Sequence, residues 1–101
     1  MTEGAVLAMT LSVARDYLAD KIRCNCISPA RVHTPFVDGF VARTYPGQEE
    51  EMMEKLAHSQ PIGRMGRPDE IGWLALYLCS EAASFITGVD YPIDGGFVNL
   101  R

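Results

Sequence analysis

The feature that most constrains this chain is a short apolar run that leads into a segment bounded by two prolines. The run Ile22–Ile27 is rich in β-branched and small apolar residues and has the length of a strand. Pro29 has no N–H to donate to a ladder and biases Ser28 toward an extended backbone, so we expect the strand to end there. Pro35 repeats the constraint, which keeps the segment between the prolines irregular. In open α/β sheets, ligands bind beside such segments, at the carboxyl ends of strands.

Helical patterns surround this strand. Apolar residues at helical spacing predict a helix from Gly4 to Asp20 that is apolar on two sides. A Pro-Gly turn followed by acidic residues predicts a second helix, from Gln48 to His58. A third is predicted from Asp69 to about Ser80, because Pro68 suits a first helical position. The segment from Phe36 to Tyr45 has an apolar face, and we interpret it either as a lid over a pocket or as a satellite of the core.

The end of the chain predicts a second strand. Gly88 marks one turn and Asp94-Gly95-Gly96 another, and Pro92 between them favours a strand at an edge or a strand end. Strands separated by helices predict parallel pairing through a crossover connection. The fold class is therefore α/β, in the order helix, strand, lid-like segment, helix, helix, strand. Because two strands make a poor parallel sheet, we expect residues 1–101 to be the C-terminal part of one doubly wound domain.

Composition argues against several classes of function. The formal net charge of −4 disfavours a nucleic-acid partner, which requires clustered Lys and Arg. No apolar run approaches the roughly 20 residues that span a bilayer, so no membrane partner is expected. Glu3 stands where a signal peptide carries basic residues. Three cysteines inside apolar runs favour a reducing cytoplasm over a disulfide framework.

Metal and nucleophilic chemistry have little support in the sequence. Structural zinc sites prefer wider Cys pairs on loops, so we predict no metal site and expect Cys24 and Cys26 to be buried apolar residues. No carboxylate or nucleophile can be assigned to His33 from the sequence. We therefore assign no catalytic residue to this chain.

Four segments, in this order, closely resemble the short-chain dehydrogenase/reductase family: Asn25–Pro35, Pro61–Ile71, Ala83–Gly88 and Asp94–Gly96. The resemblance implies a Rossmann-type fold, of which residues 1–101 would be the C-terminal segment of a single, incomplete domain. It also implies NAD or NADP as the cofactor of the complete protein, and hydride transfer between a hydroxyl and a carbonyl carbon. The family's glycine-rich turn for the cofactor pyrophosphate has no counterpart in these residues.

The register of the resemblance also concerns catalysis. The family's catalytic Ser and Tyr would precede this segment, and Glu3 falls where the family has a Lys that lowers the pKa of that Tyr. A carboxylate would raise that pKa instead. Glu3 thus indicates either a truncated start or an inactive relative. Because these residues contain no glycine-rich turn for the pyrophosphate, we expect the isolated chain to be inactive.

The resemblance assigns the nicotinamide side of the cofactor to the turn after the first strand, at Pro29, Ala30, Val32 and Thr34. Ala30 stands where the family usually has Gly. Thr34 would hydrogen-bond the carboxamide or a phosphate oxygen; alternatively it caps the next turn.

For the small-molecule substrate, the sequence indicates Arg31, Phe36 and Phe40. Arg31, Arg43 and Arg101 are the basic groups best placed to meet a carboxylate, which favours a sugar, a sugar acid or a hydroxy acid. The alternative is that all three arginines are solvated surface residues.

Two functions of different classes follow. The first is the C-terminal part of an NAD(P)-dependent oxidoreductase, cytoplasmic and homo-oligomeric through its first helix, last helix and last strand. The second is a non-catalytic assembly module that docks on intact homologues.

Overall fold

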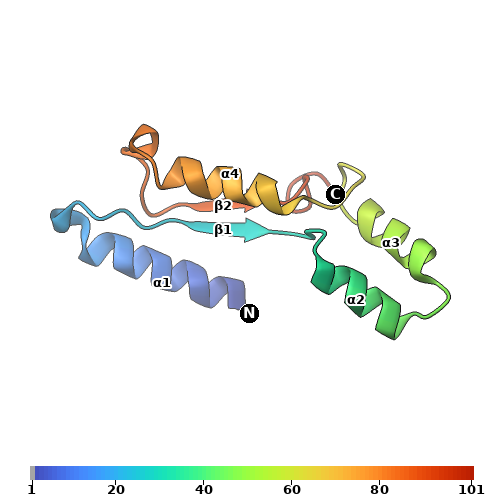
Figure 1. The fold of residues 1–101 in the computed structure, drawn as a ribbon. Helices are drawn as coiled ribbons and strands as arrows, with labels where there is room; N and C mark the ends of the chain where they lie inside the picture. Colours follow the sequence, from blue (N-terminus) through green and yellow to red (C-terminus); the bar gives the residue numbers. More distant parts are fainter. Residues whose placement is uncertain (1) are drawn as a thin grey trace. The chain divides into compact units, whose positions relative to one another are not determined.

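The computed structural model describes the backbone of residues 2–101 and the side chains of residues 4–101, so the expectation for the Glu3 side chain lies outside the described residues. The elements are α1 (Thr2–Asp16), η1 (Leu18–Asp20), β1 (Cys26–Pro29), α2 (Pro35–Thr44), α3 (Glu49–His58), α4 (Pro68–Leu78), η2 (Glu81–Ala83) and β2 (Asp90–Ile93) (Figure 1). The α/β class and the predicted order are confirmed, and the lid-like segment is the helix α2. Among the described residues, no helix is long and apolar enough to cross a membrane.

The chain consists of two compact units. The first comprises Met1–Ser28 and Gly72–Pro92, and the second comprises Pro29–Ile71 and Ile93–Arg101.

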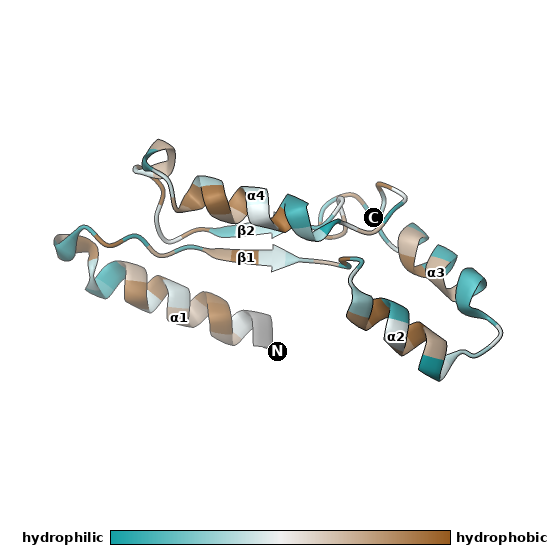
Figure 2. Ribbon diagram, in the orientation of Figure 1, coloured by the Kyte–Doolittle hydropathy of each residue, from teal (hydrophilic) through white to brown (hydrophobic). Residues whose placement is uncertain are grey.

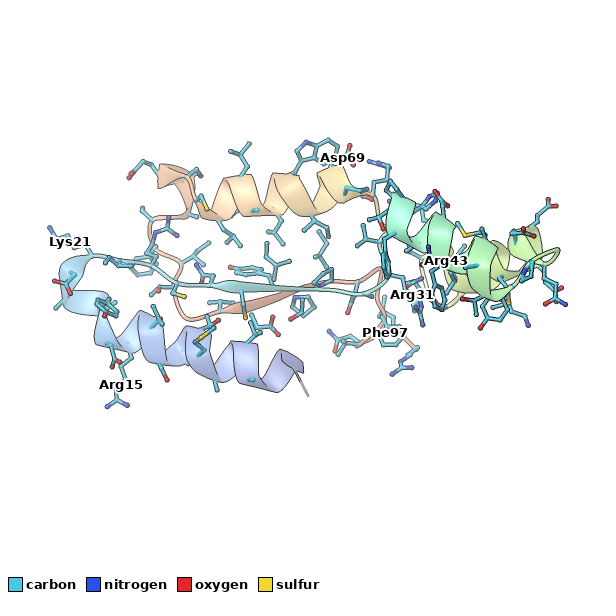
Figure 3. All side chains as sticks on the ribbon, turned by 60° about the horizontal axis from the view of Figure 1, so that its bottom comes forward. Arg15, Lys21, Arg31, Arg43, Asp69 and Phe97 are labelled. Atoms are coloured by element: carbon cyan, nitrogen blue, oxygen red, sulfur yellow. The ribbon has the colours of Figure 1, made fainter. Side chains whose placement is uncertain are left out.

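In the first unit, β1 and β2 pair side by side in parallel, as predicted (Figure 1). Helices α1 and α4 lie on opposite faces of the two strands, and Figure 3 shows Arg15 pointing from α1 away from them. The buried apolar residues of this unit are small or come from helix faces turned inward: Ala14, Cys26, Leu78 and Ala83. Parallel strands need both faces covered, and the two helices supply that cover.

The predicted strand Ile22–Ile27 is displaced: β1 begins at Cys26 and ends at Pro29. Polar side chains explain the later start. The Cys24 N–H donates to Thr87 Oγ1 at 3.1 Å, and Asn25 Oδ1 accepts from the Val89 N–H at 3.1 Å. These side chains take the place of regular ladder partners before Cys26. The end at Pro29 agrees with the prediction, since the last residue of a strand needs no ladder donor.

The first helix is shorter than predicted. It ends at Asp16 and is followed by η1, and Lys21 takes a left-handed φ of 60° that reverses the chain toward β1. Most of the second apolar face predicted for this helix is exposed: Val6 is 44%, Met9 63% and Tyr17 48% accessible, whereas Val13 is half-buried. This unit therefore leaves an apolar side of α1 uncovered.

In the second unit, α2 and α3 contact each other and run in opposite directions (Figure 1). Thr34 is the N-cap of α2 and Pro35 occupies its first turn, the arrangement that the missing N–H of proline favours. Gly47, with φ 81°, makes the turn between the helices. The start of α3 is strongly hydrophilic in Figure 2 because it carries Glu49, Glu50 and Glu51.

The rest of the second unit holds the segment after β1 in place. Val32 and Gly66 form an isolated parallel bridge. The Ile62 N–H donates to the Gly95 carbonyl at 3.0 Å, which ties the 59–67 loop to the turn that follows β2.

Candidate functional site

A pocket of ≈ 560 Å³ in the second unit lies where residues 29–34 (the 29–34 turn) meet α2 and α3. Its volume falls within the roughly 300–1,000 Å³ of small-molecule sites. The residues that line it are Pro29, Ala30, Arg31, Val32, Thr34, Phe36, Val37, Phe40, Leu56 and Met65. Every cofactor and substrate residue assigned from the sequence is among them.

Hydrogen bonds to Gln60 and Gly66 fix the backbone of the 29–34 turn. The Arg31 N–H donates to Gln60 Oε1 at 3.1 Å, and the Arg31 carbonyl accepts from the Gly66 N–H at 2.8 Å. The His33 N–H donates to the Gly66 carbonyl at 2.9 Å. Gln60 is only 3% exposed, and its Nε2 donates to the Leu56 carbonyl at 2.8 Å, which joins the turn to the end of α3. A buried amide with both ends paired makes a rigid support.

Thr34 caps α2, as one of the two roles considered for it in the sequence analysis requires. Its Oγ1 accepts from the Val37 N–H at 3.4 Å. A hydroxyl that accepts one hydrogen bond still has its own proton to donate. Thr34 can thus cap the helix and donate to a ligand in the pocket.

The helical wall of the pocket is apolar and partly open. Phe36 is 74% and Phe40 44% exposed, whereas Val41 on the same helix is 1% exposed and belongs to the core. Val37 of α2 also lines the pocket and was not assigned as a site residue from the sequence. Nor were two further lining residues, Leu56 and Met65. They approach the turn from α3 and the 59–67 loop, and only the Pro61–Ile71 resemblance gave a signal for Met65.

The three arginines proposed to meet a carboxylate are not brought together. Arg31 lines the pocket. An added Cβ on Gly39 would lie 3.3 Å from Arg43 Nη1, so Arg43 folds back over its own helix. The Arg101 guanidinium stacks on the Phe97 ring, 3.9 Å from its centroid. Neither Arg43 nor Arg101 lines this pocket.

The structure gives His33 a carboxylate partner that could not be assigned from the sequence. His33 Nε2 lies 2.7 Å from Asp38 Oδ1, and both side chains are about half exposed, at 48% and 59%. The helix start explains the pairing, because it turns Asp38 back toward the residue before the N-cap. The pair lies outside the pocket lining and braces the first turn of α2.

Next to the site, Glu70 forms a bidentate ion pair with Arg64, at 2.8 and 3.1 Å. This hydrogen bonding, together with the Arg67 N–H at 2.9 Å, lowers the pKa of Glu70 to about 2. The pair fastens the 59–67 loop to the start of α4.

The described residues contain no group of three or more His, Cys, Asp or Glu side chains placed to bind a metal ion. Cys26 is buried as expected, Cys24 is half-buried and Cys79 is exposed.

Comparisons with known proteins agree with the resemblance seen in the sequence. The profile of a family described as enoyl-(acyl carrier protein) reductase matches residues 1–98. The 2-keto-3-deoxy-L-fuconate dehydrogenase of Xanthomonas campestris pv. campestris is 38% identical over 99 residues, which cover 98% of this chain and 33% of that protein.

Two solved structures are also similar. L-Sorbose reductase from Gluconobacter frateurii, complexed with NADPH and L-sorbose, has a TM-score of 0.88 at 28% identity, over 97% of this chain and 39% of that one. Ligand-free aldohexose dehydrogenase from Thermoplasma acidophilum has a TM-score of 0.82 at 36% identity, over 93% of this chain and 38% of that one. The present chain thus spans about a third (33%) of the length of the Xanthomonas dehydrogenase.

Proposed function

This chain belongs to the short-chain dehydrogenase/reductase family, and we propose that it is the C-terminal part of an NAD(P)-dependent oxidoreductase that interconverts a hydroxyl and a carbonyl. One observation carries the proposal: the seven residues assigned to cofactor and substrate line one pocket. The reductase and dehydrogenase names of the relatives support the same reaction class.

The pocket wall fits the nicotinamide end of a dinucleotide. Val32 and Ala30 offer an apolar surface to the ring, and the Thr34 hydroxyl is available to donate to the carboxamide or a phosphate oxygen. NAD or NADP, when bound, would exchange a hydride at its nicotinamide C4 with the carbon that bears the substrate oxygen. The hydrogen bonds that the turn makes with Gln60 and Gly66 hold its backbone in place, so little order has to be imposed when the cofactor binds.

Helix α2 supplies the substrate side. Phe36 and Phe40 face the pocket from a helix that also anchors itself through the buried Val41. Aromatic side chains that close over a pocket exclude water and hold the substrate near the reacting atom. We expect a sugar, a sugar acid or a hydroxy acid as the substrate class.

The complete protein is proposed to be a cytoplasmic homo-oligomer, assembled through α1, α4 and β2. The exposed apolar residues of α1 (Val6, Met9) and α4 (Leu76, 71% exposed) support an interface on these helices. The same exposure supports the rival proposal, a non-catalytic module that docks on intact homologues.

The test uses the protein expressed from its complete gene, with every residue encoded ahead of residue 1. Binding of NADH and NADPH is measured by the fluorescence of the reduced nicotinamide, for the native protein and for Thr34→Val, Thr34→Ser and Thr44→Val. Thr34→Val should weaken binding of the preferred cofactor about tenfold, or roughly 1.4 kcal/mol. Thr34→Ser keeps the hydroxyl and should bind normally, as should Thr44→Val, which lies at the far end of α2.

Absence of binding to either dinucleotide would contradict the oxidoreductase and favour the docking module. If the native protein and the three variants bound the dinucleotide equally well, Thr34 would not contact the cofactor.

A further inference from the structure

Arg31 is the one charged residue among the described residues that line the pocket. Its backbone is held on both sides, by Gln60 Oε1 and by the Gly66 N–H. Its guanidinium makes no hydrogen bond or ion pair with any side chain of residues 4–101. A fixed backbone that carries an unpaired cation beside a pocket is suited to bind an anion from outside the chain.

The nearby carboxylates of the protein form no ion pair with Arg31. Arg31 also borders a smaller pocket of ≈ 180 Å³, which Glu70 and Asp94 line as well. Glu70 is taken up by the bidentate pair with Arg64. Asp94 accepts from the Gly96 N–H at 3.0 Å and the Val98 N–H at 3.2 Å, which stabilises its own turn.

Apart from Arg31, the described residues of the larger pocket offer little to a polyhydroxylated substrate. Among the described residues that line this pocket, Thr34 is the only one besides Arg31 whose side chain forms strong hydrogen bonds. The walls are formed by apolar side chains such as Phe36, Phe40, Leu56 and Met65. A hydroxyl packed against such walls loses hydrogen bonds to water on that side without replacement. A sugar presents several hydroxyls, whereas a carboxylate on an apolar body presents one polar group.

We propose that the substrate is an oxo or hydroxy acid with a single carboxylate, which Arg31 binds, on a compact aliphatic or aromatic body that packs on α2. This inference rests on the proposed function, because it places the substrate in the same pocket, and it narrows the substrate class away from sugars. The planar guanidinium pairs with a carboxylate through two parallel hydrogen bonds, and so fixes the orientation of the acid as well as its charge.

The test measures dissociation constants by titration calorimetry on the protein expressed from its complete gene. The probes are 4-methyl-2-oxopentanoate, its neutral amide, and D-gluconate. We expect the oxo acid to bind at least tenfold more tightly than the amide and more tightly than gluconate. Arg31→Gln should abolish the preference for acid over amide, and Arg31→Lys should keep part of it. Arg43→Gln, the matched control on α2, should keep all of it.

Three results would overturn the inference: equal affinity for the acid and the amide, tighter binding of gluconate, or an acid preference that survives Arg31→Gln. A cofactor phosphate is the other source of an anion, so the affinity for NADH and NADPH is measured on the same variants. A loss of dinucleotide affinity in Arg31→Gln larger than its loss of acid affinity would assign Arg31 to the cofactor and also overturn the inference.

The two proposals fail separately. Acid preference that depends on Arg31, without any dinucleotide binding, would support the anion site and contradict the oxidoreductase. Dinucleotide binding without a preference for the acid would support the oxidoreductase and contradict the anion site at Arg31.

Discussion

Replacing Gln60 with Met should loosen the 29–34 turn while keeping the volume of the side chain. Gln60 is 3% exposed and makes two hydrogen bonds, from the Arg31 N–H (3.1 Å) and to the Leu56 carbonyl (2.8 Å). The Leu56 carbonyl would still accept a hydrogen bond from Ser59 Oγ, at 2.7 Å, so the loss of the Gln60 donor is partly compensated. The Arg31 N–H loses its acceptor. At about 0.5–1.5 kcal/mol for each hydrogen bond, we expect a loss of roughly 1–2.5 kcal/mol.

Urea unfolding followed by circular dichroism measures the stability, and amide hydrogen exchange at Arg31 measures the local effect. Ser59→Ala is the matched control, because it removes one donor from a carbonyl that keeps Gln60; it should lose less than about 0.5 kcal/mol and leave Arg31 exchange unchanged. If Gln60→Met unfolds like the native protein and the Arg31 amide exchanges no faster, Gln60 does not support the turn.

Four other outcomes are expected. Gly95→Ala should destabilise the protein by about 1–3 kcal/mol more than Gly47→Ala does. Both glycines have a positive φ, but only at Gly95 would an added Cβ lie 2.6 Å from Ile62 Cγ2. Equal losses of free energy in urea unfolding would disprove this close contact. The pKa of Glu70 is lowered to about 2, so its contribution to stability is present above its ordinary pKa near 4.5 and is lost as pH falls toward 2. The difference in free energy of unfolding between the native protein and Glu70→Gln should therefore vanish across that pH range. A difference that stays constant with pH would refute this. A polypeptide of residues 1–101 should not bind NADH, because it has no glycine-rich turn for the pyrophosphate; a micromolar dissociation constant would contradict this. The same polypeptide should associate and bind hydrophobic dyes through the exposed face of α1, whereas a monomer with a sharp melt would not fit.

The elements were largely predictable because their signals are local. Pro68 and the acidic residues after it mark the start of α4, and Thr34 with Pro35 marks the start of α2. The start of β1 was missed because it depends on contacts distant in sequence: Thr87 and the Asn25–Val89 pair replace the ladder over residues that have strand composition.

The pocket follows the same division. The 29–34 turn and the aromatic residues of α2 lie in one continuous stretch, so the sequence places them together. Gln60, Leu56 and Met65 reach the turn from elsewhere in the chain. No local pattern in the sequence indicates Gln60 or Leu56, and only the resemblance of Pro61–Ile71 points to Met65. The His33–Asp38 pair was missed for a different reason: its partner lies one helical turn beyond a cap, a spacing that becomes close only once α2 has formed.

The central claim is that the 29–34 turn contacts the nicotinamide of a bound cofactor. Intermolecular nuclear Overhauser effects, recorded on the complete gene product with ¹³C-labelled valine methyl groups, test it most directly, with Val32→Ala to identify the Val32 signals. We predict effects between the nicotinamide ring protons and the Val32 methyl groups, which disappear in Val32→Ala. Bound cofactor whose ring protons show no effect to Val32 would contradict the claim.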